Sequence, residues 1–134
     1  SAYFVQAFSR IGLIPDVGGT YFLPRAMGLA KAIGSAIFAD KIMAAEAHEI
    51  GLIYEYVEDD NYDIHLKSRV EYLANGPTVA FAGIKTAMRK SLNNSLDEQL
   101  ELEAKLQKKC GNTRDFQEGV LAFHEKRDAK FEGR

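Results

Sequence analysis

The sequence predicts a mainly helical chain that also contains one or two short strands. From residue 18 onward, apolar side chains recur at helical spacing in segments that end at glycine, asparagine or proline. Only residues 1–8 and 52–57 combine the aromatic and β-branched residues that favour strands. An isolated strand is not stable in water, so we expect that further elements of the fold precede Ser1.

The elements of the first half follow one another with short connections. We expect, in order, a strand at residues 1–8, helices at 18–27, 29–38 and 44–50, and a strand at 52–57. Pro24 limits the regularity of the first helix near its end, because proline lacks a backbone N–H. Gly51 stands where helices commonly end and closes the third helix.

The second half contains helix signals alone. We expect helices at residues 62–75 and 78–92, a third that starts after Ser95 and a fourth that starts after Thr113. Ser95 and Glu98 have the spacing of a capping box, in which each side chain binds the other's backbone N–H. The helix at 78–92 is expected to turn four apolar side chains inward: Val79, Ile84, Ala87 and Met88.

The composition is that of an ordinary globular chain, with 46% hydrophobic and 27% charged residues. A formal net charge of -2 gives no positive field for a nucleic-acid backbone, and no apolar run approaches the roughly 20 residues that span a bilayer. Cys110 is the only cysteine, which excludes an intrachain disulfide and favours a cytoplasmic location. The histidines lack the spacing of ligand pairs, so we expect no metal site.

One stretch, residues 11–25, has the features of a functional turn. An apolar run ends at Pro15, Asp16 follows, and Gly18 and Gly19 then open a helix. Glycines allow a ligand to approach the backbone, and free N–H groups at a helix start favour a negative oxygen. Asp16 is our candidate for proton transfer, because an apolar pocket would disfavour its charged form. An equally weighted alternative is that these residues only shape a turn and start a helix.

The turn and two later motifs resemble the enoyl-CoA hydratase/isomerase (crotonase) superfamily. These motifs are Ala44-Ala-Glu-Ala-His-Glu-Ile-Gly-Leu-Ile53 and Glu118-Gly-Val-Leu-Ala-Phe-His-Glu-Lys-Arg127. The resemblance implies the C-terminal part of the α/β crotonase (ClpP-like) spiral fold. It assigns residues 1–57 to the end of the crotonase core with the active-site turn, and residues 58–134 to a helical oligomerisation region.

Two positions that differ between hydratases and isomerases of the superfamily can be identified in this sequence. Hydratases of the superfamily have a catalytic Glu in the strand ahead of the glycine turn, where this sequence has Phe8. Hydratases commonly have Gly after the proline, whereas several isomerases have Asp, as Asp16 is here. This combination is similar to the isomerases, above all those that act on ring epoxides in phenylacetate breakdown. It implies an acyl-CoA substrate and, beyond coenzyme A itself, no cofactor.

The resemblance also places further residues. The acyl group is expected to meet Phe8, Ile14, Pro15, Gly18 and Phe22, whereas the two oxyanion donors would lie in the N-terminal half of the family fold. This chain alone is therefore expected to be a poor catalyst.

The resemblance also gives the basic tail and the helices of the second half a role. Lys126 and Lys130 could approach coenzyme A phosphates, although a solvated helix end explains them equally well. Trimers or hexamers are expected. The alternatives are an enoyl-CoA hydratase, a fatty enoyl-CoA isomerase and a non-catalytic helical oligomerisation module.

Overall fold

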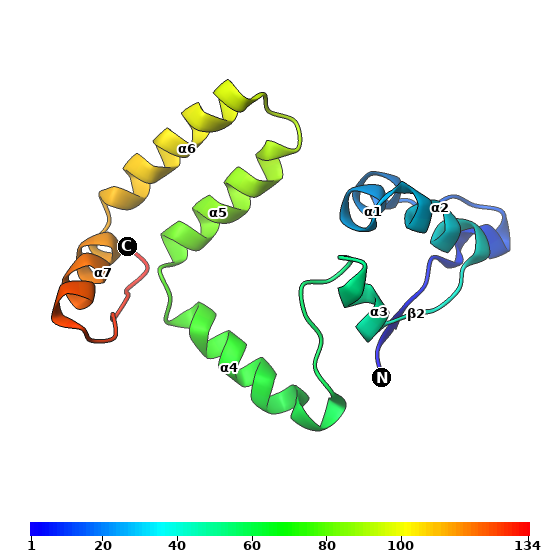
Figure 1. The fold of residues 1–134 in the computed structure, drawn as a ribbon, viewed down its shortest axis with the longest axis horizontal. Helices are drawn as coiled ribbons and strands as arrows, with labels where there is room; N and C mark the ends of the chain where they lie inside the picture. Colours follow the sequence, from blue (N-terminus) through cyan, green and yellow to red (C-terminus); the bar gives the residue numbers. More distant parts are fainter. The chain divides into compact units, whose positions relative to one another are not determined.

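The computed structural model describes residues 1–134, and the chain divides into two compact units, residues 1–63 and 64–134. Eleven elements follow one another along it (Figure 1). In the first unit these are β1 (Tyr3–Phe4), η1 (Ala7–Ile11), α1 (Gly19–Met27), α2 (Leu29–Phe38), β2 (Ile42–Met43), α3 (Ala44–Glu49) and η2 (Asp59–Asn61). The second holds most of α4 (Tyr62–Ala74), with α5 (Thr78–Ser91), α6 (Leu96–Gly111) and α7 (Arg114–Glu125).

Every expected helix is present, and the bounds differ from the prediction by a few residues at most. The capping box is formed, because Ser95 Oγ accepts the Glu98 N–H at 3.4 Å and Glu98 Oε2 accepts the Ser95 N–H at 2.8 Å. Thr113 Oγ1 likewise accepts the N–H of Phe116 at 3.1 Å. Local signals were therefore sufficient to fix where these helices begin.

Two short strands are present, as expected, but only the first lies within a stretch that the sequence predicted. β1 keeps only two residues of the stretch 1–8, and it pairs antiparallel with β2, with Tyr3 opposite Met43. The second predicted strand, at 52–57, does not form. Instead, the backbone N–H groups of Leu52 and Ile53 both donate to the carbonyl of Ala47, at 2.8 and 3.2 Å, and so wrap the chain around the end of α3.

The core of the first unit is small and lies between α1, α2, β2 and α3. Its buried members are Met27, Ala32, Ile42 and Ala47, with Leu23, Ile50, Leu52 and Ile53 packed partly buried around them. The alanine at 32 leaves room for α1 and α2 to lie side by side, as Figure 1 shows. Residues 52 and 53 are apolar because they complete this core.

The second unit is a series of helices, in which α5 and α6 form an antiparallel pair and α7 contacts α6 (Figure 1). The prediction that Ile84 and Met88 face inward was wrong, since their exposed fractions are 54% and 68%. Val79 and Ala87 of the same helix are half-buried. Thus one face of α5 packs within the unit while other apolar side chains remain uncovered. No helix in the chain combines the length and apolar character needed to span a membrane.

Candidate active site

The glycine turn has a backbone that only certain residues can adopt. The N–H of Gly19 donates to the carbonyl of Asp16 at 2.7 Å, and α1 begins directly afterwards. Gly18 has φ +82°, in the left-handed region that favours glycine. A Cβ added at Gly18 would lie 2.9 Å from Phe22 Cε2, and one at Gly19 would lie 3.0 Å from Pro15 Cβ. Both glycines are therefore needed for the turn to close against its neighbours.

Val17 is the most unusual residue of the turn. Its φ is +48°, which is strained for a β-branched residue, and its exposed fraction is 95%. No buried contact explains why a valine stands there. Strain of this kind is found at functional sites more often than elsewhere, and here it lies next to the candidate carboxylate Asp16.

Asp16 lies in the turn with an exposed side chain. Its apolar neighbours do not enclose it, because Ile14 is 76% exposed and Val17 is 95% exposed. The apolar pocket expected around this carboxylate is not built by these two residues within this chain. The carboxylate does lie just before the first N–H groups of α1, whose partial positive charge stabilises an anion.

The other predicted acyl contacts divide into two groups. Within the turn, Phe22 lies against Gly18, and Pro15 lies against the neighbouring Gly19. Phe8 lies elsewhere, in the 3-10 helix η1, and the expectation that it lies in a strand was wrong. The chain leaves the extended conformation there because the N–H of Leu13 donates back to the carbonyl of Phe8 at 3.0 Å, with Gly12 at φ +74°.

A hollow of about 190 Å³ lies behind the turn, between α1 and α2. It is almost wholly apolar, and its lining residues are Pro15, Gly19, Thr20, Leu23, Pro24, Leu29, Ala32, Ile33 and Ala36. Pro15 and Gly19 join this hollow to the turn that carries Asp16. The turn thus carries an exposed carboxylate at Asp16 and, through Pro15 and Gly19, part of the lining of an apolar recess.

The two predicted phosphate-binding lysines lie in the second unit. Lys126 ends α7 with φ +54°, a left-handed conformation that is uncommon for a lysine. Lys130 follows in the C-terminal segment, where its backbone N–H donates to Glu118 Oε1 at 2.8 Å. Both side chains are exposed, so both ammonium groups are available to an anion.

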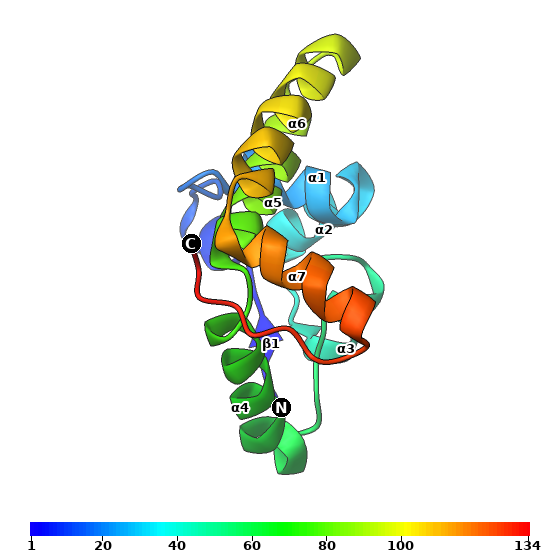
Figure 2. The ribbon, with the colours of Figure 1, turned by 90° about the vertical axis from the view of Figure 1, so that its left-hand side faces the viewer.

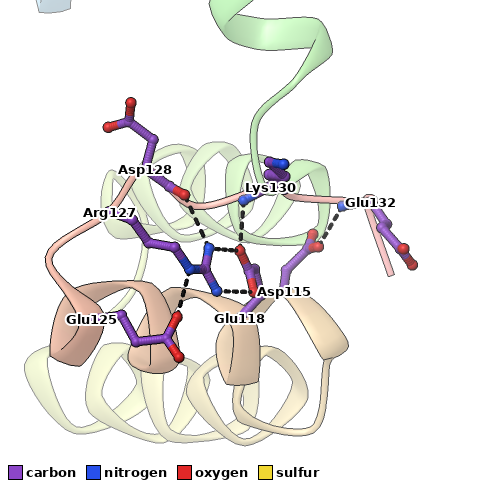
Figure 3. Close-up of polar contacts among 7 residues, drawn as sticks. All are labelled: Asp115, Glu118, Glu125, Arg127, Asp128, Lys130 and Glu132. Atoms are coloured by element: carbon purple, nitrogen blue, oxygen red, sulfur yellow. Dashed lines mark hydrogen bonds and ion pairs between the residues drawn. The ribbon is translucent and has the colours of Figure 1, made fainter.

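The sequence analysis missed a cluster of charged residues on and after α7. Arg127 donates to both carboxylate oxygens of Glu118, at 2.6 and 3.0 Å, and to Glu125 Oε2 at 2.6 Å (Figure 3). Hydrogen bonds from Arg127, and next from the backbone of Lys130, lower the pKa of Glu118 to about 2. The same pairing raises the pKa of Arg127. Local sequence gave no signal for this cluster, because Arg127 reaches Glu118 only after the chain reverses at Lys126.

The fold is shared with solved structures described as enoyl-CoA hydratases or isomerases. The crystal structure of an enoyl-CoA hydratase/isomerase from Cupriavidus metallidurans CH34 matches with a TM-score of 0.90 and 32% identity, over 98% of this chain and 50% of that chain. The fold is therefore the mainly helical part of the crotonase fold that the resemblance predicted.

The family follows from the sequence match. The family model "Enoyl-CoA hydratase/isomerase" matches residues 1–134, and the chain belongs to this family. A protein named "Probable enoyl-CoA hydratase" from Rhodobacter capsulatus is 53% identical over all of this chain and 52% of its own length. The "1,2-epoxyphenylacetyl-CoA isomerase" of Escherichia coli strain K12 is 42% identical over all of this chain and 51% of its own length. The chain thus spans about half the length of the curated relatives it matches.

Proposed function

We propose that this chain supplies the proton-transferring carboxylate of an acyl-CoA isomerase, and that the carboxylate is Asp16. The observation that carries the proposal is the pair of residues at positions 8 and 16. Phe8 has no group that could activate water, whereas Asp16 presents a carboxylate at the start of α1. A site with one carboxylate suits removal and return of a proton better than addition of water.

The proposed chemistry is a shift of a double bond, or the rearrangement of a ring epoxide, in an acyl-CoA thioester. In the double-bond shift, Asp16 takes a proton from a carbon near the thioester, and the electron pair of that C–H bond moves toward the carbonyl oxygen to form an enolate. Two backbone N–H groups stabilise that oxyanion in the family, and they would come from outside this chain. The same carboxyl group returns the proton at another carbon.

The neighbours of the turn define where the acyl group lies in this proposal. In this proposal Pro15, Gly18 and Phe22 meet the acyl group next to Asp16, while Ile14 and Phe8 offer further apolar contact from the preceding segment. Ile14 is 76% exposed here and is thus available to a substrate or to another part of the fold. No cofactor is needed, because the thioester itself acidifies the carbon.

The basic residues after α7 serve binding in this proposal. The ammonium groups of Lys126 and Lys130 are exposed and would meet the phosphates of coenzyme A. Breakdown of phenylacetate is the metabolic setting we propose, since the Escherichia coli relative is a 1,2-epoxyphenylacetyl-CoA isomerase.

Assembly into a trimer or hexamer is a further part of the proposal. Several large apolar side chains of the second unit are exposed, including Leu96 at 73%, Met88 at 68% and Phe123 at 83%. Exposed apolar groups in such number are typical of surfaces that another chain covers.

An enoyl-CoA hydratase is the second candidate. The Rhodobacter capsulatus relative, at 53% identity, carries that name, and this favours hydration in spite of Phe8. Because residue 8 is a phenylalanine, a carboxylate at another position would have to orient the water in such an enzyme. Asp16 is the carboxylate that the turn offers.

One experiment separates the candidates. Asp16→Asn in the whole protein that contains this chain should abolish isomerisation of enoyl-CoA substrates, with Asp40→Asn, an exposed aspartate of the same unit, as the matched control. Crotonyl-CoA hydration is measured in parallel. Retained isomerisation in Asp16→Asn would remove Asp16 from the mechanism, and efficient hydration by the unmodified protein would favour the second candidate.

A further inference from the structure

Three residues other than glycine have a positive φ in this chain: Val17 at +48°, Ala39 at +54° and Lys126 at +54°. Such a backbone is costly for any residue that has a Cβ, and it is a clear outlier for a β-branched residue such as valine. Two of these residues are compensated by contacts within the chain. Val17 is not, and it stands between Asp16 and Gly18 of the candidate site.

Ala39 and Lys126 show what such compensation is. Ala39 has an exposed fraction of 0%, and its carbonyl accepts a hydrogen bond from the Arg10 guanidinium at 2.6 Å. Lys126 ends α7 and turns the chain back along that helix, as Figure 2 shows in red. This reversal brings Arg127 to the Glu118 carboxylate at 2.6 Å. Each of these two backbones is therefore offset by burial or by hydrogen bonds.

Val17 has neither kind of compensation. Its exposed fraction is 95%, and neither its N–H nor its carbonyl forms a hydrogen bond within the chain. The turn around it is closed by the Gly19 N–H, which donates to the Asp16 carbonyl at 2.7 Å, and both central residues of the turn have a positive φ. Asparagine followed by glycine adopts such a turn at the least cost. Since the backbone shape alone would be served better by asparagine, what valine adds at this position is its side chain.

The reaction proposed for the turn brings an acyl group close to this side chain. A trans peptide joins Asp16 to Val17, so their Cα atoms lie about 3.8 Å apart. Proton transfer requires the reacting carbon within about 3–3.5 Å of the carboxylate. An acyl group that reacts at Asp16 is thus within reach of the exposed methyl groups of Val17, which nothing in the chain covers. Apolar contact there excludes water, which strengthens the electrostatic interactions of the reacting groups.

We propose that Val17 is a substrate-contact residue, whose methyl groups pack against the acyl group and exclude water from Asp16 when the thioester binds. The bound acyl group would then complete the apolar surroundings that the chain alone does not build around the carboxylate. Val17 can play this part only if an acyl group reacts at Asp16, so the role rests on the function proposed above.

Substitutions at position 17 of the whole protein test the contact, because stability and turnover should change in opposite directions. Val17→Asn suits the positive φ and should raise the urea midpoint of unfolding, yet it should lower kcat/KM for isomerisation about tenfold. Val17→Thr keeps the branched shape and the backbone cost but places a hydroxyl in the contact. It should leave the urea midpoint unchanged and also lower kcat/KM about tenfold.

The matched control is Val70→Thr, the same change at a 55% exposed valine of α4, and it should leave kcat/KM unchanged. Asp16→Asn is measured in parallel. If it abolishes isomerisation while both Val17 variants keep full kcat/KM, the contact is refuted and the proposed function stands. A loss in Val17→Asn with full activity in Val17→Thr would assign the effect to the backbone and would refute the contact as well. Retained isomerisation in Asp16→Asn would overturn the proposed function and the role of Val17 with it.

Methyl NMR of the whole protein, labelled at valine, tests the contact without turnover. The Val17 methyl signals are identified by their absence from Val17→Thr. They should shift when phenylacetyl-CoA is added, because an aromatic ring changes the magnetic field at a methyl group beside it, whereas the Val70 signals should stay in place. Coenzyme A without an acyl group should leave the Val17 signals unmoved. Equal shifts with coenzyme A and with phenylacetyl-CoA, or no shift with either, would overturn the proposal.

Discussion

Gly18 offers the sharpest test of the turn that carries Asp16, because two separate costs meet at one residue. A Gly18→Ala substitution places a side chain at φ +82°, which costs about 1–2 kcal/mol for an ordinary residue. The new Cβ would also lie 2.9 Å from Phe22 Cε2, so the ring must leave its rotamer at a further cost of about 0.5–1.5 kcal/mol. We expect a loss of about 1.5–3.5 kcal/mol in the free energy of unfolding.

Two other glycines of the same unit separate these costs. Gly12 has φ +74° and no atom within 4 Å of an added Cβ, so Gly12→Ala should show the backbone cost alone. Gly34 lies inside α2 with open space around it, and Gly34→Ala should stabilise the chain by about 0.5–1 kcal/mol. Urea unfolding followed by far-ultraviolet circular dichroism measures all three.

The contact with the ring has its own control. In Gly18→Ala combined with Phe22→Leu, the shorter side chain should remove the clash and return the loss to that of Gly12→Ala. If Gly18→Ala costs no more than Gly12→Ala while Phe22 is present, then the close approach of the ring contributes nothing. If Gly18→Ala is as harmless as Gly34→Ala, the described turn is wrong.

Three more predictions concern the second unit. Ser95→Ala removes the capping box and should lower the free energy of unfolding by about 1 kcal/mol, measured by urea unfolding. Because the folded pKa of Glu118 is about 2 and its ordinary value is 4.5, its stabilising effect is complete above pH 4.5 and is lost as the pH falls toward 2. Stability should therefore fall less steeply over this range in Glu118→Gln. Replacing both Lys126 and Lys130 by alanine should weaken the binding of coenzyme A by about tenfold, measured by calorimetry, and leave the folding stability nearly unchanged. Unaltered binding would show that neither lysine binds the phosphates.

The helices could be predicted from the sequence because their signals are local. The capping pair Ser95 and Glu98 and the cap Thr113 act within a few residues of where they stand. Apolar periodicity within each segment supplied the rest. None of these signals requires knowledge of what a segment packs against.

The strands could not be predicted in the same way, because pairing depends on distant residues. β1 pairs with Ile42–Met43, a stretch too short to show a period of two. Residues 52–57 have the composition of a strand, but Leu52 and Ile53 serve the small core next to Ala47 instead. The sequence therefore predicts correctly that Leu52 and Ile53 pack against other apolar residues, but not that they do so outside a strand.

The candidate site was predictable in part, for the same reason. The turn at Asp16, Gly18 and Gly19 is a continuous stretch, and the structure forms it as a turn that starts a helix. The network of Glu118 and Arg127 depends on a reversal at Lys126, where a lysine adopts a left-handed backbone that sequence patterns assign to glycine or asparagine. The local sequence does not predict that reversal.

Val17 has a consequence for how this turn would respond to selection. Asparagine tolerates a φ near +48° far better than valine, and the exposed valine gains no packing in return. Variants chosen for thermal resistance alone should therefore drift to asparagine at this position. Variants chosen for turnover should hold valine if its strained backbone is what aims the neighbouring carboxylate. Selection for stability and selection for turnover would thus favour different residues at position 17.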